Sequence, residues 1–156
     1  MSAVGYSIVT GGAIALAAAT AKCVLGAKAH ANSGLNLKKF KVSSDGVTTT
    51  AVPILMELCY STWATNAPGT NSSSVTPAQT YGRVLTAGFT AGKTWTAEPT
   101  VLTVLDEWLL PALMGGLPWE FSLGTEYDCA LAEGFVLRFT APAIVNVRAS
   151  MDLERI

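Results

Sequence analysis

The chain is poor in charge and nearly devoid of histidine. Only 13% of its 156 residues are Asp, Glu, Lys or Arg, against about 25% in a typical soluble domain. Soluble monomers usually carry more charge than this. The low value favours a surface that is covered either by other subunits or by Ser and Thr side chains, and we expect an oligomer.

The sequence has no basic region of the kind that binds nucleic acid. Its formal net charge is −1 and its Lys and Arg residues are scattered, so the charge pattern excludes a phosphate-tracking surface. Lys38, Lys39 and Lys41 form a small basic cluster. We interpret it as the solvated face of a strand rather than as a phosphate site.

Catalytic and metal-binding patterns are also missing. His30 is the single histidine and adjoins a turn, which excludes a zinc site with two histidines and favours a surface or interface residue. Glu126, Asp128 and Glu133 could supply oxygen ligands to calcium, but they lack the spacing of a known calcium loop, and solvated charge is favoured. No phosphate-binding glycine motif occurs. We therefore expect no enzyme, cofactor or metal.

The three cysteines do not form a complete set of pairs. Cys23, Cys59 and Cys129 are widely spaced and fit no metal motif. Cys23 and Cys59 have apolar neighbours, where a free thiol behaves as a small buried hydrophobe. Assembly inside a cell is the simplest context.

The N-terminal region is apolar but does not resemble a targeting signal. No basic residue precedes Lys22, whereas a secretory signal begins with positive charge. A membrane span needs roughly 20 mostly apolar residues, and the Gly11-Gly12 pair interrupts this run. We expect a retained segment that contacts no membrane, built from two strands, Val4–Val9 and Ala13–Ala18, with the glycines between them.

Alternating apolar residues and frequent turn residues indicate a chain of strands. In the last segment, one phase is apolar and predicts the buried face: Val145, Val147, Ala149, Met151 and Leu153. The segment 134–140 alternates similarly, and the short link 141–143 predicts that these two strands are neighbours. The apolar phase changes at Lys38-Lys39, which predicts a bulge there. Further strands are expected in the segments 54–60, 81–91 and 117–124. The segment 100–113 also fits one face of a helix, but its Thr and Val content and the flanking prolines favour a strand.

These patterns predict an all-β, single-domain β-sandwich or jelly-roll-like barrel of about eight to ten antiparallel strands. Residues 1–20 form N-terminal strands or an arm, and residues 65–80 form a long polar loop. Loops of this length inside a domain are usually functional or mobile. Within it, the candidate exposed residues are Asn66, Asn71 and Ser73.

The uncharged N-terminal region, the apolar stretch at 111–114 and an aromatic residue after it supply the candidate contacts with a neighbouring subunit. The candidate interface residues are Ile14, Leu16, Leu113, Met114 and Trp119. Tryptophans could instead form a sugar-stacking platform, with Trp63 and Trp95 as its testable members. In a small β-domain, aromatic side chains are more often core or interface anchors.

Several segments resemble a group of small virion proteins of tailed phages. The shared pattern includes Val24-Leu25-Gly26, Asn32-Ser33-Gly34-Leu35, Thr96-Ala97-Glu98-Pro99-Thr100, Phe121-Ser122-Leu123-Gly124 and Ala141-Pro142-Ala143. The resemblance covers most of the chain from about residue 13 and includes no catalytic motif.

The resemblance implies a structural protein that decorates or stabilises a phage capsid. Its expected partners are further copies of itself, as a homotrimer or another ring, and the major capsid protein or other virion proteins. Its expected location is the virion, after assembly in the host cytoplasm and without a signal peptide. The alternative function is a glycan- or receptor-binding jelly-roll module of a phage tail or spike.

Overall fold

The computed structural model describes residues 3–45, 53–111 and 116–156, and every regular element within them is a β-strand. Thirteen strands lie in the described residues, more than the sequence predicted. They are β1 (Val4–Val9), β2 (Ile14–Leu16), β3 (Ala21–Lys28), β4 (Leu35–Asp45), β5 (Ile54–Ser61), β6 (Ser73–Val75), β7 (Ala78–Tyr81), β8 (Thr90–Lys93), β9 (Leu102–Leu110), β10 (Leu117–Glu120), β11 (Tyr127–Cys129), β12 (Gly134–Thr140) and β13 (Val145–Arg155).

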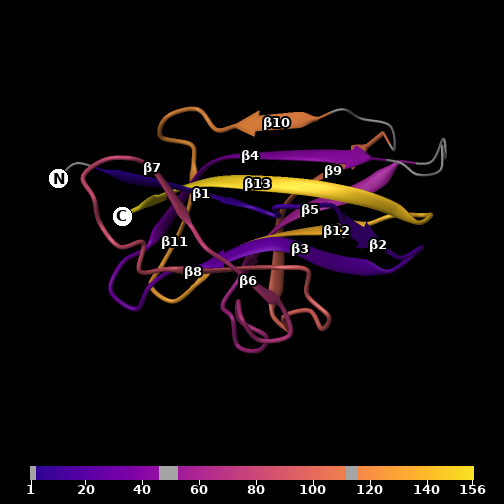
Figure 1. Ribbon diagram of the computed structural model, residues 1–156, viewed down its shortest axis with the longest axis horizontal. Helices are drawn as coiled ribbons and strands as arrows, with labels where there is room; N and C mark the ends of the chain where they lie inside the picture. Colours follow the sequence, from indigo (N-terminus) through magenta and orange to yellow (C-terminus); the bar gives the residue numbers. More distant parts are fainter. Residues whose placement is uncertain (1–2, 46–52, 112–115) are drawn as a thin grey trace.

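The first sheet is organised around β13, the last strand of the chain (Figure 1). Its strand order is β10-β4-β13-β1-β7, with β11 also pairing β4 and β2 also pairing β13. Because β1 and β2 both pair with β13, the apolar N-terminal region is an integral part of this sheet. All pairings in the sheet are antiparallel.

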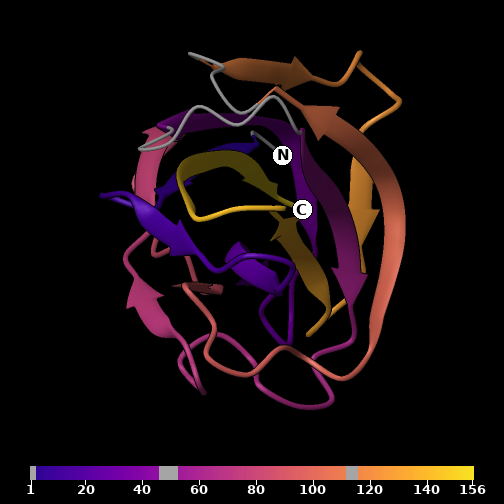
Figure 2. The ribbon, with the colours of Figure 1, turned by 90° about the vertical axis from the view of Figure 1, so that its right-hand side faces the viewer.

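The second sheet has the order β6-β8-β3-β12-β5-β9 and is also antiparallel. Its centre is β12, which pairs with β3 on one side and β5 on the other. The strands at its two edges are β6 and β9. Seen from the end, the two sheets face each other around a shared interior (Figure 2), which makes the fold a β-sandwich.

The core between the sheets consists of the apolar phases that the sequence predicted. All five apolar residues of the predicted phase in β13 are buried, and this confirms the period-2 pattern. The largest fully buried side chains include Tyr6, Phe40, Phe135, Phe139, Ile8, Leu16, Leu25 and Met56. The predicted bulge is confirmed as well, because Asp152 and Leu153 pair with Lys39 and Leu37 and leave Lys38 without an opposite residue.

A second apolar cluster forms outside the sandwich, on the outer face of the second sheet. It consists of Cys23, Cys59, Trp63, Trp95 and Val136, with Ala67 and Leu102 packed against it. The strands β3, β5 and β12 are therefore buried on both faces near their centres. This explains why the segment 134–137 is buried without alternation.

One prediction about a connection is wrong. The strands β12 and β13 are not neighbours, since β12 lies in the second sheet and β13 in the first. The link at 141–143 carries the chain from one sheet to the other, and the Ala19 N–H donates to the Ala141 oxygen there, 2.7 Å away. Period-2 alternation identifies a strand but says nothing about which sheet it joins.

Three segment boundaries also differ from the prediction. The predicted polar loop 65–80 contains β6 and most of β7. The predicted strand over 81–91 is mostly irregular, and only its last residues enter β8. The second N-terminal strand is shorter than expected, because within 13–18 only Ile14–Leu16 pairs with β13.

Candidate interaction site

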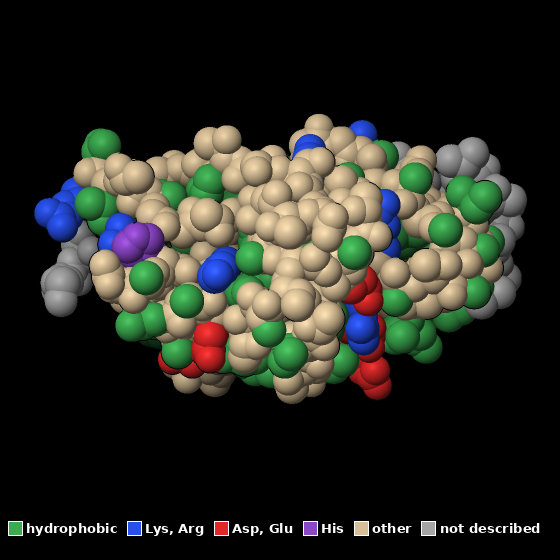
Figure 3. All heavy atoms as spheres, turned by 90° about the horizontal axis from the view of Figure 1, so that it is seen from below, with side chains coloured by type: hydrophobic (Ala, Val, Ile, Leu, Met, Phe, Trp, Pro, Cys, Tyr) green, Lys and Arg blue, Asp and Glu red, His purple; other side chains and the backbone are tan. Residues whose placement is uncertain are grey.

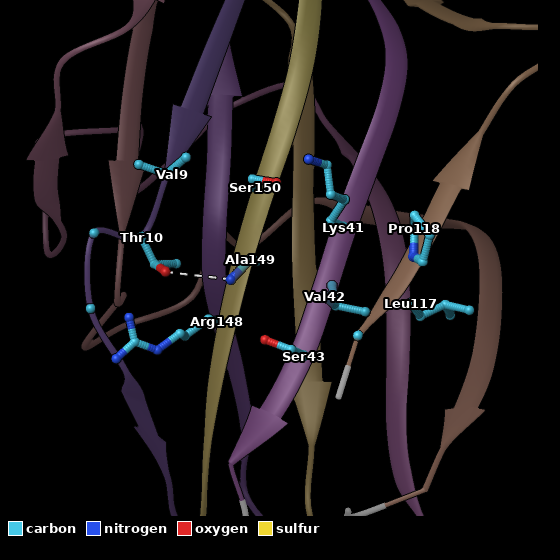
Figure 4. A pocket seen from close by; sticks show the side chains of 13 residues that line it. Val9, Thr10, Lys41, Val42, Ser43, Leu117, Pro118, Arg148, Ala149 and Ser150 are labelled. Atoms are coloured by element: carbon cyan, nitrogen blue, oxygen red, sulfur yellow. Dashed lines mark hydrogen bonds between the residues drawn. The ribbon is translucent and has the colours of Figure 1, made fainter. Parts of the chain in front are cut away.

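A groove of about 580 Å³ lies on the outer face of the first sheet. Its floor is made by β4 and β13, one wall by the turn after β1, and the other wall by the start of β10 (Figure 4). The side chains that line it include Val9, Thr10, Lys41, Ser43, Leu117, Pro118, Arg148 and Ser150.

The first wall exists because β1 and β2 pair with different parts of the same strand. Val9 lies opposite Ser150, whereas Ile14 lies opposite Val147. The residues between them cannot all fit this short stretch of β13, so the chain bends outward at the glycine pair. Gly11 has a φ of 68°, a conformation that favours glycine.

Hydrogen bonds with two strands, one from each sheet, hold this wall in place. Thr10 N–H donates to the Ala149 oxygen at 3.0 Å, and Ala149 N–H donates to Thr10 Oγ1 at 3.4 Å (dashed line in Figure 4). Lys93 Nζ, from β8 in the other sheet, donates to the Thr10 oxygen. Thr10 is itself buried, so the wall is a rigid part of the sandwich.

Two cations and two hydroxyl groups face the solvent from the floor. In the pairing of β4 with β13, Lys41 lies opposite Ser150 and Arg148 lies opposite Ser43. These residues share the outer face because their neighbours Val42 and Ala149 point into the core. Diagonal neighbours of this kind are roughly 7–8 Å apart. Figure 4 shows the Arg148 side chain directed toward the turn after β1 and the Lys41 side chain directed along the strands toward Ser150, so the groove offers two separate cations.

The cations of the groove lack the counter-charges that neighbouring lysines have. Lys39 pairs with Asp152 at 3.4 Å, and Lys38 pairs with Glu126 and Glu154. Within the part of the chain that the structure describes, no carboxylate oxygen lies within 4.0 Å of Lys41 or Arg148. The groove is therefore suited to binding an anionic partner through charge and hydroxyl donors.

Sequence reasoning missed this site. It recognised the basic cluster but treated its three lysines alike, whereas the bulge directs Lys38 and Lys39 toward carboxylates. Arg148 lies on the outer face because it alternates with Val147 and Ala149, which the sequence predicted to be buried. The signal for the site is that each of the two strands carries a cation and a serine on its polar phase. A single sequence does not show that β4 pairs with β13, so it does not show that these residues are neighbours.

The predicted interface residues are distributed over three environments. Ile14 and Leu16 point into the core, with 8% and 1% of their surface exposed, so these side chains are not available to a partner. Trp119 is 39% exposed on the edge strand β10, and its ring contacts that of Trp108, with the ring centroids 5.5 Å apart. Leu113 and Met114 lie outside the described residues.

The predicted exposed loop is a hydrogen-bonded structure that packs against the second sheet. Asn66 is half-buried, and its side chain donates to the Glu98 backbone oxygen at 2.8 Å. The Asn71 amide donates to Asn66 Oδ1 at 2.7 Å. Asn71 and Ser73 are exposed as predicted. Because its polar groups bond to one another, the loop is held in one conformation.

Trp63 and Trp95 are unavailable to a ligand at the surface. They are only 5% and 2% exposed, and they stack on each other beneath the loop. Their burial agrees with the favoured interpretation of these tryptophans as core anchors, and it leaves neither ring free to stack on a sugar. The aromatic residues of the second sheet stabilise its outer cluster instead.

Glu57 and Glu98 form an ion-pair network with Arg138, close to the thiol of Cys23. Arg138 Nε lies 2.7 Å from Glu57 Oε2, and its guanidinium lies 3.7 Å from Glu98. The thiol of Cys23 donates to Glu98 Oε1 at 3.4 Å. Burial and the neighbouring carboxylate raise the pKa of Cys23 well above the usual range. The thiol therefore stays protonated, which does not favour a nucleophilic role.

The acidic residues considered for calcium point to separate partners. Glu126 pairs with Lys38, and Glu133 accepts a hydrogen bond from the Ala130 N–H at 3.2 Å. Among the described residues, no group of three or more His, Cys, Asp or Glu side chains is arranged to hold a metal ion. His30 accepts a hydrogen bond at Nδ1 from the Asn32 N–H.

Known proteins add nothing to this description. Comparison with protein-family models, with curated proteins and with solved structures finds no match to the chain. The described residues contain no helix that is long and apolar enough to cross a membrane.

Proposed function

We propose that this chain is a non-enzymatic structural protein of a phage particle that decorates or stabilises the capsid through contacts between subunits. The resemblance of its sequence to small virion proteins supports the phage context. The β-sandwich supports a role as a rigid building block, because its interior is filled by side chains and its edges are free to meet neighbours.

The observation that carries the proposal is the exposure of large apolar side chains on the open edges of the two sheets. The edge strand β9 exposes 66% of Leu109 and 41% of Val104, and the edge strand β10 exposes 39% of Trp119. On the face seen in Figure 3, uncharged atoms cover most of the surface, and the charged side chains lie in several separate groups. Exposed apolar residues that gather on strand edges favour contact with another protein.

The proposed partners are further copies of this chain, as a trimer or another ring, and the shell subunits beneath them. A stable contact of this type buries about 1,200–2,000 Å² in total. Such contacts would add apolar burial at the seams between shell subunits.

Cryo-electron microscopy of the purified particle tests the proposal. We expect density for this sandwich on the outer surface of the shell, repeated with the symmetry of the capsid. Absence of the chain from the particle would contradict the proposal. Density at the tail tip or a spike would instead support the alternative of a receptor-binding module.

A further inference from the structure

Two pairs of adjacent charged side chains have no opposite charge within the described part of the chain. One is the cationic pair Lys41 and Arg148 in the groove. The other is Asp106 and Glu107 on β9, where no Lys or Arg nitrogen of the described residues lies within 4.0 Å of either carboxylate. The acidic residues that do form ion pairs are Glu57, Glu98, Glu126, Asp152 and Glu154.

Asp106 and Glu107 lie on an open edge of the second sheet and point to opposite faces of it. Asp106 is half-buried opposite Leu58 of the core and accepts a hydrogen bond from the Glu107 N–H at 2.9 Å, whereas Glu107 lies on the outer face. The strand β9 spans nine residues and pairs with β5 alone. Glu107 is exposed and lies opposite Glu57, a residue of like charge that Arg138 already neutralises. Because like charges that face each other across strands destabilise a sheet, Glu107 gains most from a cation outside its own chain.

The two surfaces also match in their apolar residues. Beside the acidic pair, β9 exposes Val104 and Leu109. Beside the cationic pair, the groove walls present Val9, which is 48% exposed, and the side chains of Leu117 and Pro118. Each surface therefore combines two charges of one sign with an apolar margin, and their signs are opposite.

We propose that the groove receives the β9 edge of a second copy of this chain. The inserted strand directs Glu107 to one side and Asp106 to the other, so that each carboxylate faces one of the two cations, Lys41 and Arg148, with Ser43 and Ser150 as hydroxyl donors. The contact joins two different surfaces, so it is head-to-tail and generates a ring or an open filament. The inference deepens the proposed function, which requires contacts between subunits, by naming the surfaces that make them.

Sedimentation of the full chain with two neutral double variants tests the proposal. One variant, Lys41→Gln with Arg148→Gln, removes the charge of the groove and keeps the acidic strand. The other, Asp106→Asn with Glu107→Gln, removes the charge of the strand and keeps the groove. We expect the wild-type chain to self-associate, and each variant to weaken association by about tenfold or more.

Mixing the two variants identifies the geometry of the contact. A mixture contains one intact groove and one intact acidic strand on different molecules. We therefore expect a one-to-one heterodimer that does not grow further, because the remaining groove and strand are both neutral. We also expect the wild-type association to weaken as salt increases, since exposed charges are screened.

Charge-matched variants elsewhere serve as controls. Lys28→Gln with Arg83→Gln removes two cations that lie outside the groove, and Glu120→Gln with Asp128→Asn removes two acidic groups that lie outside β9. Both controls should associate like the wild type. Thermal unfolding of every variant checks that the fold is retained.

Three results would overturn the proposal: a wild-type chain that stays monomeric at its highest soluble concentration, double variants that associate like the wild type, or a mixture that fails to form the heterodimer. A monomeric chain whose groove binds an acidic segment of another protein would assign the groove to that partner instead. None of these results depends on finding the chain on a capsid, so this inference and the proposed function can fail separately.

Discussion

The indole ring of Trp63 stacks on that of Trp95, with ring centroids 5.9 Å apart and an angle of 19° between the planes. The Trp95 Nε1–H donates to the backbone oxygen of Asn66 at 2.8 Å. One contact thus joins the outer face of the second sheet to the polar loop above it. The polar loop covers the outer cluster around Trp63 and Trp95, and the hydrogen bond from Trp95 holds the loop at Asn66.

Replacing Trp95 tests whether this outer cluster stabilises the fold. Trp95→Ala removes a side chain that is 2% exposed, together with its stacking contact with Trp63 and its hydrogen bond to Asn66. We expect the free energy of unfolding to fall by about 3–5 kcal/mol, as for other buried tryptophans. Denaturant titration followed by far-UV circular dichroism measures the change.

Trp119→Ala is the matched control, because this tryptophan is 39% exposed. We expect a loss of about 1 kcal/mol there. Equal losses for both variants would show that the outer cluster contributes no more than a surface contact.

Arg138 stabilises the chain by neutralising Glu57. Arg138→Met leaves this carboxylate, whose side chain is 10% exposed, without its hydrogen-bonded partner at 2.7 Å. We expect a loss of about 2–3 kcal/mol, less than for a fully buried pair because the arginine side chain remains 23% exposed.

Lys39→Met is the comparison for Arg138→Met. Its ion pair with Asp152 is longer, at 3.4 Å, and both side chains are 33% exposed. The expected loss is about 0.5 kcal/mol or less. Urea titration of both variants measures the two losses in free energy of unfolding. Similar losses would contradict a larger stabilisation by Arg138 than by Lys39.

All three cysteines should be unreactive in the folded protein. Burial raises the pKa of Cys59 and of Cys129 to about 11, and that of Cys23 is raised further. Because the thiolate is the reactive form, we expect no reaction with a thiol-specific disulfide reagent at neutral pH. Reaction should follow unfolding in denaturant, and rapid labelling of the native chain would contradict the prediction.

Much of the fold could be predicted because burial follows the local period of the sequence. The inward phase of β13, the bulge at Lys38 and the burial of Cys23 and Cys59 all depend on neighbours along the chain. Which sheet a strand joins depends on contacts distant in sequence. The error at the link 141–143 has this origin.

The groove was not predicted because it depends on pairing between strands far apart in the sequence. Lys41 and Arg148 are separated by most of the chain and become neighbours only through the register of β4 with β13. Ile14 and Leu16 were misjudged for the same reason. Their apolar character was evident, but the partner that covers them is the chain's own core.

The ion pair between Lys38 and Glu126 gives the stability a dependence on acid pH. The hydrogen bond from Lys38 lowers the pKa of the Glu126 carboxyl from its ordinary value of 4.5. A carboxyl with a lowered pKa in the folded state stabilises the fold above its ordinary pKa, and this contribution is lost as the pH falls through the lowered value.

Glu126→Gln should therefore destabilise the chain at neutral pH and have little effect once the pH lies below the lowered pKa. Melting temperatures of both proteins across the acid range measure this. Parallel curves for the two proteins would contradict the assignment.

Gly134 lies where β12 is packed tightly against the backbone of its neighbour β3 and against the ring of Trp63. A Cβ placed there would overlap the Ala27 backbone oxygen and lie 2.8 Å from Trp63 Nε1. Gly134→Ala must therefore separate β12 from β3 or displace the tryptophan, and we expect a loss of at least about 3 kcal/mol. Gly12→Ala is the control, since no atom lies within 4 Å of its Cβ position, and its expected change is about 0.5 kcal/mol or less. Thermal unfolding distinguishes the two, and a stable Gly134→Ala variant would contradict the close packing of Trp63 against β12.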